Sequence, residues 1–317
     1  MTETELPIDA FVNCPPTVIV NKLAKFLRDG CLCLFIGSGV SMSTNNDEKD
    51  ISNTKFPGWI SLVDRLCKIH RRPFDLELAK KSNDYILSTT EAIEAEYDSP
   101  ESGFLEIVKK NLYKGITYDI NTLKLRLMIA IGSLVMGMIG GSAGVVVNYN
   151  FDDVFEWYLA NHGFRIQVIS DFFKLTKRCD VTIYHPHGFL PYTKKFFDLQ
   201  TKDIVFSKIS YERILGDDNH PWNQLVKNLL ATKVCLFVGL SGQDLNIRSL
   251  CTKTYEVIGK KRALGFVVLQ KKLGQNKQEL LDTNAEFTRR GLVPFYVNEH
   301  NETPDLLLKI SRSAAEI

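Results

Sequence analysis

Polar residues follow four apolar runs of this chain, and their types suit nucleotide binding and proton transfer. Gly37-Ser38-Gly39-Val40-Ser41 comes directly after the apolar run at residues 31–36. Three later runs end in Asn150 with Asp152, in His187 with Gly188, and in Gly239 with Ser241. Glycines after a strand leave backbone N–H groups open to a phosphate, and histidine can act as a base near neutral pH. Because parallel strands end at one edge of a sheet, we expect a nucleotide and a catalytic pair to meet there.

Each motif also has a simpler interpretation when it is taken alone. The glycine loop departs from the dinucleotide fingerprint at Met42, where a third glycine belongs, so an ordinary dehydrogenase is disfavoured and a tight strand-to-helix turn stays open. The amide of Asn150 suits holding ribose hydroxyls or a water, but asparagine is also common in turns.

The histidine pair and the last glycine-rich motif also have alternatives. His185 and His187 have no acidic or cysteine partner at metal-site spacing, so we expect no metal, and His185 alone is also typical of a core histidine. Gly239-Leu240-Ser241-Gly242-Gln243 lacks the second glycine of a nucleophile elbow, which leaves a serine hydrolase as a minor hypothesis.

Apolar strand-like runs alternate with helical patterns along the chain. We expect strands at residues 31–36, 145–148, 181–184, 234–238, 265–269 and 293–297. Helices are expected at 16–28, 59–70, 104–112, 154–161, 222–230, 247–258, 275–289 and 304–310. This alternation predicts an α/β fold with a Rossmann-like, doubly wound parallel sheet of about six strands.

The regions between these elements are expected to be helical or turn-rich. Residues 71–120 hold helical fragments without strand-like alternation, so we expect a small helical insertion within a single domain that covers residues 1–317. The polar stretch at 43–55 is expected to be a mobile loop over the glycine edge. Residues 127–147 carry no charge, but five glycines interrupt them, so we expect a buried helix that ends near Ile139 rather than a membrane span.

Composition narrows the class of protein. The chain has 317 residues, 44% apolar content and a formal charge of +2, and its basic residues are scattered among acidic ones. Without a block of five like charges, we expect neither direct nucleic-acid binding nor membrane binding. The seven cysteines include no Cys-x-x-Cys pair, which favours a reducing, cytoplasmic compartment and gives no zinc site.

Taken together and in order, the four motifs resemble those of the sirtuin-like (silent-information-regulator-like) superfamily. The resemblance covers residues 30–260 and rests on Gly37-Ser38-Gly39-Val40-Ser41, Asn148-Tyr149-Asn150-Phe151-Asp152, His187-Gly188, Gly239-Leu240-Ser241 and the segment Phe56-Pro57-Gly58-Trp59. Two departures matter, because the chain lacks the zinc ribbon of the deacylases and has Gly58-Trp59-Ile60 where they carry Asp-Phe-Arg. The sequence therefore resembles the zinc-free branch found in bacterial antiphage-defence proteins, which hydrolyse NAD.

The resemblance implies an NAD domain with a helical subdomain and no zinc ribbon. It assigns catalytic roles to Asn150 and His187. It assigns NAD contacts to Gly37, Ser38, Gly39, Ser41, Trp59, Asp152, Gly239, Ser241 and Asp244. The expected activity is hydrolysis of NAD, as substrate, to nicotinamide and ADP-ribose by a regulated NAD-depleting effector in antiphage defence and abortive infection.

Other functions share the same predicted NAD site. An NAD-dependent protein deacylase or ADP-ribosyltransferase would also need an acceptor cleft, and a non-catalytic module would sense NAD without turnover. Because a cell cannot tolerate an unrestrained NAD hydrolase, we expect a homo-oligomer or an activating partner protein to control the activity. The sequence names neither the trigger nor a preference between NAD and NADP.

Overall fold

The structure is a computed structural model of the whole chain. It describes residues 8, 11, 14–45, 56–97, 103–119, 121, 123–136, 141–171, 178–192, 201, 203–215, 217–240, 244–272 and 274–316. Most of the predicted loop at 43–55, and the predicted NAD contact Ser241, lie outside the described residues.

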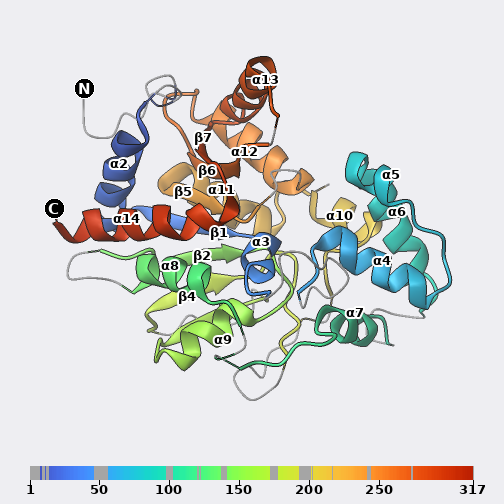
Figure 1. Ribbon diagram of the computed structural model, residues 1–317. Helices are drawn as coiled ribbons and strands as arrows, with labels where there is room; N and C mark the ends of the chain where they lie inside the picture. Colours follow the sequence, from blue (N-terminus) through green and yellow to red (C-terminus); the bar gives the residue numbers. More distant parts are fainter. Residues whose placement is uncertain are drawn as a thin grey trace.

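Seven parallel strands form one sheet at the centre of the molecule (Figure 1). They are β1 (Leu32–Ile36), β2 (Val145–Asn148), β3 (Ile166–Ile169), β4 (Val181–Tyr184), β5 (Val234–Val238), β6 (Gly265–Gln270) and β7 (Leu292–Val297), in the order β3-β4-β2-β1-β5-β6-β7. All five residues of β1 and all five of β5 are buried, as expected for the middle of a parallel sheet. The predicted α/β fold with a doubly wound parallel sheet is confirmed.

Strand order places a crevice beside β1. Strand β1 pairs with β2 on one side, where Ile36 lies opposite Asn148, and with β5 on the other, where Ile36 lies opposite Val238. The order therefore reverses at β1, and ligands of such sheets bind at this kind of switch point, beyond the carboxyl ends of the strands. The residues after β1, β2, β4 and β5 are those that the sequence singled out.

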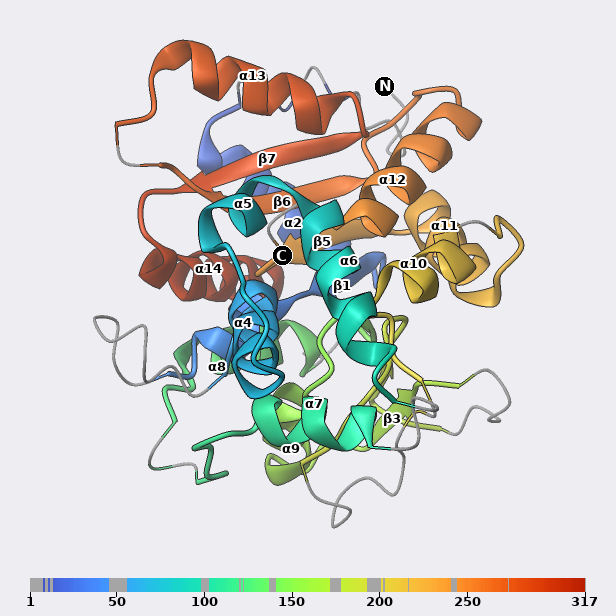
Figure 2. The ribbon, with the colours of Figure 1, turned by 90° about the vertical axis from the view of Figure 1, so that its right-hand side faces the viewer.

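Helices cover the sheet and its carboxyl edge. They are α2 (Pro16–Arg28), α3 (Ser38–Met42), α4 (Trp59–Ile69), α5 (Leu76–Lys81), α6 (Asn83–Glu94), α7 (Phe104–Leu112), α8 (Arg126–Val135), α9 (Val154–Asn161), α10 (Lys208–Leu215), α11 (Pro221–Thr232), α12 (Leu245–Val257), α13 (Lys277–Thr288) and α14 (Thr303–Glu316), with a short 3-10 turn at His300–Glu302. Helix α14 packs against α2 and α8, and α11 packs against α12. Helices α4 to α7 and α10 lie to the right of the sheet in Figure 1, and this side of the molecule faces the viewer in Figure 2.

Several local expectations differ from the structure, including helix α3, which was not predicted, and α14, which continues to Glu316 instead of ending at Ile310. Strand β3 was not predicted, so the sheet has seven strands rather than about six. It lies at the edge of the sheet, and only two of its four residues are buried, which weakens the apolar signal. Helix α8 ends at Val135 rather than near Ile139, and helix α10 was also missed. The predicted helical fragments between 71 and 120 are present as α5, α6 and α7.

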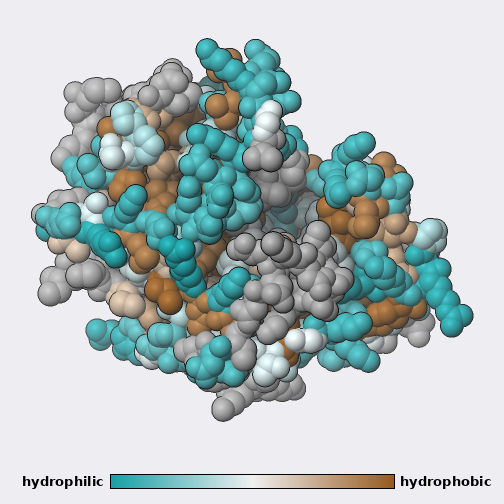
Figure 3. Space-filling view, viewed as in Figure 1, coloured by the Kyte–Doolittle hydropathy of each residue, from teal (hydrophilic) through white to brown (hydrophobic). Residues whose placement is uncertain are grey.

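The surface is mostly polar. Hydrophilic side chains cover much of the face in Figure 3, and apolar ones show over α14 and α8 and over the helices at the right. Ile129 and Met136 at α8 are about half exposed. Within the described residues, no helix is long and apolar enough to cross a membrane.

Candidate functional site

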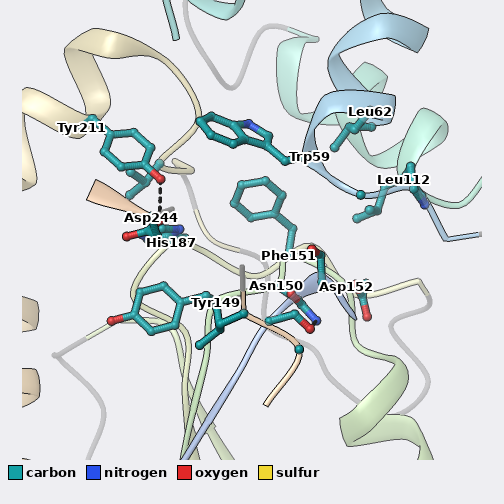
Figure 4. Close-up of a pocket in the computed structure, with 17 residues that line it drawn as sticks. Trp59, Leu62, Leu112, Tyr149, Asn150, Phe151, Asp152, His187, Tyr211 and Asp244 are labelled. Atoms are coloured by element: carbon teal, nitrogen blue, oxygen red, sulfur yellow. Dashed lines mark hydrogen bonds and ion pairs between the residues drawn. The ribbon is translucent and has the colours of Figure 1, made fainter. Parts of the chain in front are cut away.

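A cavity lies at the carboxyl edge of the sheet, between the strand ends and helices α4, α7 and α10 (Figure 4). Eight of the predicted site residues line it: Gly37, Ser38, Trp59, Asn150, Asp152, His187, Gly239 and Asp244. Further side chains line the cavity that were not among the predicted site residues. They include Leu62, Leu112, Tyr149, Phe151, Val205, Tyr211 and Leu240. Gly39 and Ser41 do not line the cavity.

The two glycine loops, after β1 and after β5, contact each other closely. The N–H of Gly37 donates to the carbonyl of Val238 at 3.2 Å, and the N–H of Gly39 donates to the carbonyl of Gly239 at 3.0 Å. A Cβ added at Gly37 would lie 2.8 Å from the carbonyl oxygen of Gly239, and one added at Gly39 would lie 2.9 Å from the Cα of Gly239. These glycines are therefore needed for close packing of the loops.

This packing corrects one part of the sequence interpretation. The N–H groups of Gly37 and Gly39 were expected to hold the pyrophosphate of a nucleotide. Both are already bonded to carbonyls of the neighbouring strand and loop, so neither N–H is free for a phosphate in this arrangement. The sequence pattern could not distinguish the two roles, because close approach of a backbone and close approach of a ligand both require glycine.

Asn150 is held in a fixed orientation at the end of β2. Its Nδ2 donates to the carbonyl of Gly37 at 3.0 Å and to Ser41 Oγ at 2.9 Å. Ser41 Oγ donates in turn to Asp152 Oδ1 at 2.8 Å. The Nδ2 atom is thus occupied, and Oδ1 of Asn150 has no hydrogen bond among the described residues. Ser41, which lies behind the cavity, acts on the site by holding these two side chains.

A fully buried polar network supports Asn150 from behind. His185 Nδ1 lies 2.9 Å from the carbonyl of Asn150, and its Nε2 lies 2.9 Å from Glu156 Oε1. Asn148 Nδ2 also donates to Glu156 Oε1 at 2.9 Å, and Asn148 Oδ1 accepts the N–H of Asn150 at 3.0 Å. His185 and Glu156 are both 0% exposed. His185 is therefore a histidine of the core that fixes the turn carrying Asn150.

His187 is buried, and its ring makes no hydrogen bond among the described residues. Its Nε2 lies 3.8 Å from Asp244 Oδ2, which is longer than a hydrogen bond. The rings of Tyr149 and Tyr211 lie 4.8 Å and 5.5 Å from the imidazole, both edge-on. Burial lowers the pKa of His187, and the carboxylate of Asp244 opposes that effect. The imidazole is therefore neutral at neutral pH and can accept a proton.

An aromatic wall closes the side of the cavity opposite the strand ends. The rings of Trp59 and Tyr211 stack with centroids 6.3 Å apart, and Phe151 lies between Trp59 and the turn that carries Asn150 (Figure 4). Leu62, Leu112 and Val205 add apolar surface. Tyr211 was missed because α10 has a weak helical pattern, whereas Phe151 could have been found from its place between Asn150 and Asp152.

The carboxyl of Asp152 is expected to make stability depend on pH. Burial raises its pKa from 3.8 to about 7, although the hydrogen bond from Ser41 lowers it. The folded state thus keeps a proton that the unfolded chain has lost, so this contribution is largest below pH 4 and is lost as the pH rises toward 7. Asp152→Asn keeps the accepting Oδ1 without the charge, and we expect it to gain stability on the order of 4 kcal/mol over the wild type at pH 8 and little near pH 4.

Urea unfolding at several pH values measures this effect. The exposed carboxyl of Asp282 provides the control, and Asp282→Asn should show no such pH dependence. Equal stability of wild type and Asp152→Asn at pH 8 would show that the buried carboxyl is not disfavoured when ionised.

Comparison with known proteins bears on the part of the chain that carries most of this site. Residues 144–288 match the family described as the SIR2-like domain. The match runs from just before β2 to the end of α13. Two parts of the site, Trp59 and the glycine loop that follows β1, lie before the matched residues. A search of curated proteins finds no match. The segment that carries Asn150 and His187 is therefore similar to the SIR2-like domain, and this similarity implies an NAD-related activity.

Proposed function

We propose that the protein is an NAD glycohydrolase that cleaves the nicotinamide–ribose bond of NAD to nicotinamide and ADP-ribose. The observation that carries the proposal is the meeting of Asn150 and His187 in one cavity. Among the described residues, Asn150 Oδ1 accepts no hydrogen bond, and Nε2 of the buried, neutral imidazole of His187 has no hydrogen-bond partner. Buried polar atoms are normally hydrogen-bonded, so the unpartnered His187 Nε2 at a switch-point crevice supports a ligand site.

The proposed mechanism uses the fixed side chains on either side of the bond. The cationic pyridinium already weakens the bond to ribose, and the faces of Trp59 and Phe151 favour a cation in a site with little water. Asn150 positions a ribose hydroxyl or the attacking water. His187 takes a proton from that water or hydroxyl, and a positioned base of this kind contributes roughly a hundredfold to ten-thousandfold.

The remaining predicted site residues are proposed to act in two ways. Gly37, Ser38, Trp59, Asp152, Gly239 and Asp244 line the cavity and stay our proposed NAD contacts. Gly39 and Ser41 are proposed to shape the loop behind them, and Ser241 stays a sequence prediction. We propose no metal and treat residues 1–317 as one domain with a helical insertion near 71–120.

The biological role is a separate part of the proposal. The resemblance to zinc-free antiphage-defence proteins supports a regulated NAD-depleting effector that acts in abortive infection. Control by self-association or by an activating protein would keep the enzyme silent in a healthy cell.

Nicotinamide release from NAD by purified protein, over a wide range of protein concentration, tests the proposed activity. We expect release by the wild type and a loss of roughly a hundredfold or more in His187→Ala, with NAD binding kept. His300→Ala, at an exposed position, is the control. A steep dependence on protein concentration would support activation by assembly.

Three other results would contradict the proposal. A fully active His187→Ala protein would remove His187 from the mechanism. NAD binding by the wild type without product, at every protein concentration tested, would contradict activation by assembly and would favour a sensor module. Release that requires an acyl-lysine peptide or a protein acceptor would favour a deacylase or a transferase.

A further inference from the structure

We propose that Asp244 and Tyr211 together set the protonation state of His187, with Asp244 as its charged partner and Tyr211 as the group that limits this pairing. This inference rests on the proposed role of His187 as the base. It makes Asp244 and Tyr211 positioning residues, in addition to the contact with NAD that Asp244 was expected to make.

The carboxylate of Asp244 is held by two hydrogen bonds beside the imidazole. Its Oδ1 accepts the N–H of Ile247 at 2.9 Å, because Asp244 is the N-cap of helix α12. Its Oδ2 accepts the hydroxyl of Tyr211 at 2.7 Å and also lies 3.8 Å from His187 Nε2. Figure 4 shows Tyr211, Asp244 and His187 together on one side of the cavity. The carboxylate therefore cannot turn away from the imidazole without losing its cap.

Asp244 is the charged group that faces His187 among the described residues. Within the part of the chain that the structure describes, the other titratable groups against its ring are Tyr149, at the end of β2, and Tyr211, on α10. Burial raises the pKa of both phenols well above the usual value, so both stay neutral throughout the physiological range. For the described residues, the protonation of His187 is thus decided between burial, which favours the neutral ring, and the carboxylate of Asp244, which favours the charged ring.

This balance suits a base that must be neutral before the reaction and charged after it. A carboxylate beside Nε2 favours the tautomer with the proton on Nε2, which leaves the lone pair of Nδ1 to accept the proton. Once Nδ1 has taken a proton from water or from a ribose hydroxyl, the new positive charge lies close to Asp244. The bond from Tyr211 occupies Oδ2 and weakens its attraction, so the resting imidazole is not held in the charged form.

Two substitutions separate the role of Asp244 from that of Tyr211, because they should shift the proton affinity of His187 in opposite directions. Asp244→Asn keeps the N-cap, since Asn caps as well as Asp, but removes the charge. We expect it to lower the proton affinity of His187 about tenfold. Tyr211→Phe removes the competing donor and should raise that affinity severalfold. A purely structural role predicts a general loss of activity without opposite shifts.

Titration of the histidine rings by NMR, in the full chain without NAD, measures these affinities directly. The signal of His187 among the six histidines is the one that is lost in His187→Ala. Asp305→Asn and Tyr296→Phe, which change groups that do not line the cavity, should leave the titration unchanged. The same pair of variants should move the acidic limb of the pH profile of nicotinamide release to lower pH for Asp244→Asn and to higher pH for Tyr211→Phe.

The titration keeps this inference apart from the proposed function. If the wild type releases no nicotinamide, the NMR result still decides whether Asp244 and Tyr211 control His187. An unchanged proton affinity in folded Asp244→Asn would overturn the inference. Should that variant not fold, an unchanged or lowered affinity in Tyr211→Phe would overturn it.

Discussion

Replacing Asn150 with Asp is expected to lower nicotinamide release from NAD roughly a hundredfold or more. The amide nitrogen that donates to the carbonyl of Gly37 and to Ser41 Oγ becomes an oxygen, which faces that carbonyl as a second acceptor. Each unpaired buried group costs about 1–3 kcal/mol, and about 2.7 kcal/mol lost from the transition state alone is a hundredfold. The new carboxylate would also lie near the buried Asp152. The substituted side chain at position 150 therefore rotates away from the carbonyl of Gly37. The oxygen that should face the ribose or the water is then no longer correctly oriented.

Steady-state kinetics and NAD binding, measured together, test this expectation. A fall in kcat with little change in the dissociation constant for NAD would identify a role in the reaction rather than in binding. Asn161→Asp, at an exposed position on α9, changes the same atoms outside the cavity and should be neutral. Wild-type kcat in Asn150→Asp would remove Asn150 from the catalytic pair.

Removing the side chain of Glu156 is expected to have the largest effect on stability. His185 lies between two acceptors, the carbonyl of Asn150 and Glu156 Oε1, and neither His185 nor Glu156 is exposed. Glu156→Ala leaves the imidazole and the amide nitrogen of Asn148 without their shared partner. Breaking a buried pair in this way costs about 3–5 kcal/mol. Urea unfolding with a two-state fit measures the loss.

An exposed ion pair supplies the matched control for this variant. Arg126 and Asp305 are both more than half exposed, so Asp305→Ala should cost less than about 1 kcal/mol. The double variant Glu156→Leu with His185→Phe removes both polar groups and should cost less than the two single changes added together. A loss in Glu156→Ala no larger than in the control would mean that the buried pair does not hold the turn.

The central strands and most helices follow from local patterns in the sequence. Strands β1 and β5 are unbroken apolar runs because both of their faces are buried, and their short length and the glycines that follow them favour strands over buried helices. Helices α2, α7 and α9 have the predicted limits. The edge strand β3 and helix α10 were missed, since elements that are only partly buried need fewer apolar residues and so leave a weaker signal.

The order of polar residues along the chain was enough to predict a common edge for Asn150, Asp152 and His187. It was not enough to predict what each of them contacts. The spacing of glycines suggested a phosphate cradle, whereas the structure uses the N–H groups of Gly37 and Gly39 to join the loops after β1 and β5. The support of Asn150 by Glu156 also depends on a side chain from α9 that reaches back under the turn.

The sequence by itself therefore determined the class of sheet and the strand ends that carry polar groups. These features depend on local hydrophobic periodicity and on residue types along the chain, whereas the choice of Asn150 and His187 as the candidate catalytic pair came from the resemblance of the ordered motifs to a known family. The tertiary structure alone decided that Tyr211, from a distant helix, takes one oxygen of Asp244, and that His187 lies beside that carboxylate without a hydrogen bond. Such contacts join residues that are tens of positions apart, and their distances follow from how the helices pack on the sheet, which no local pattern records.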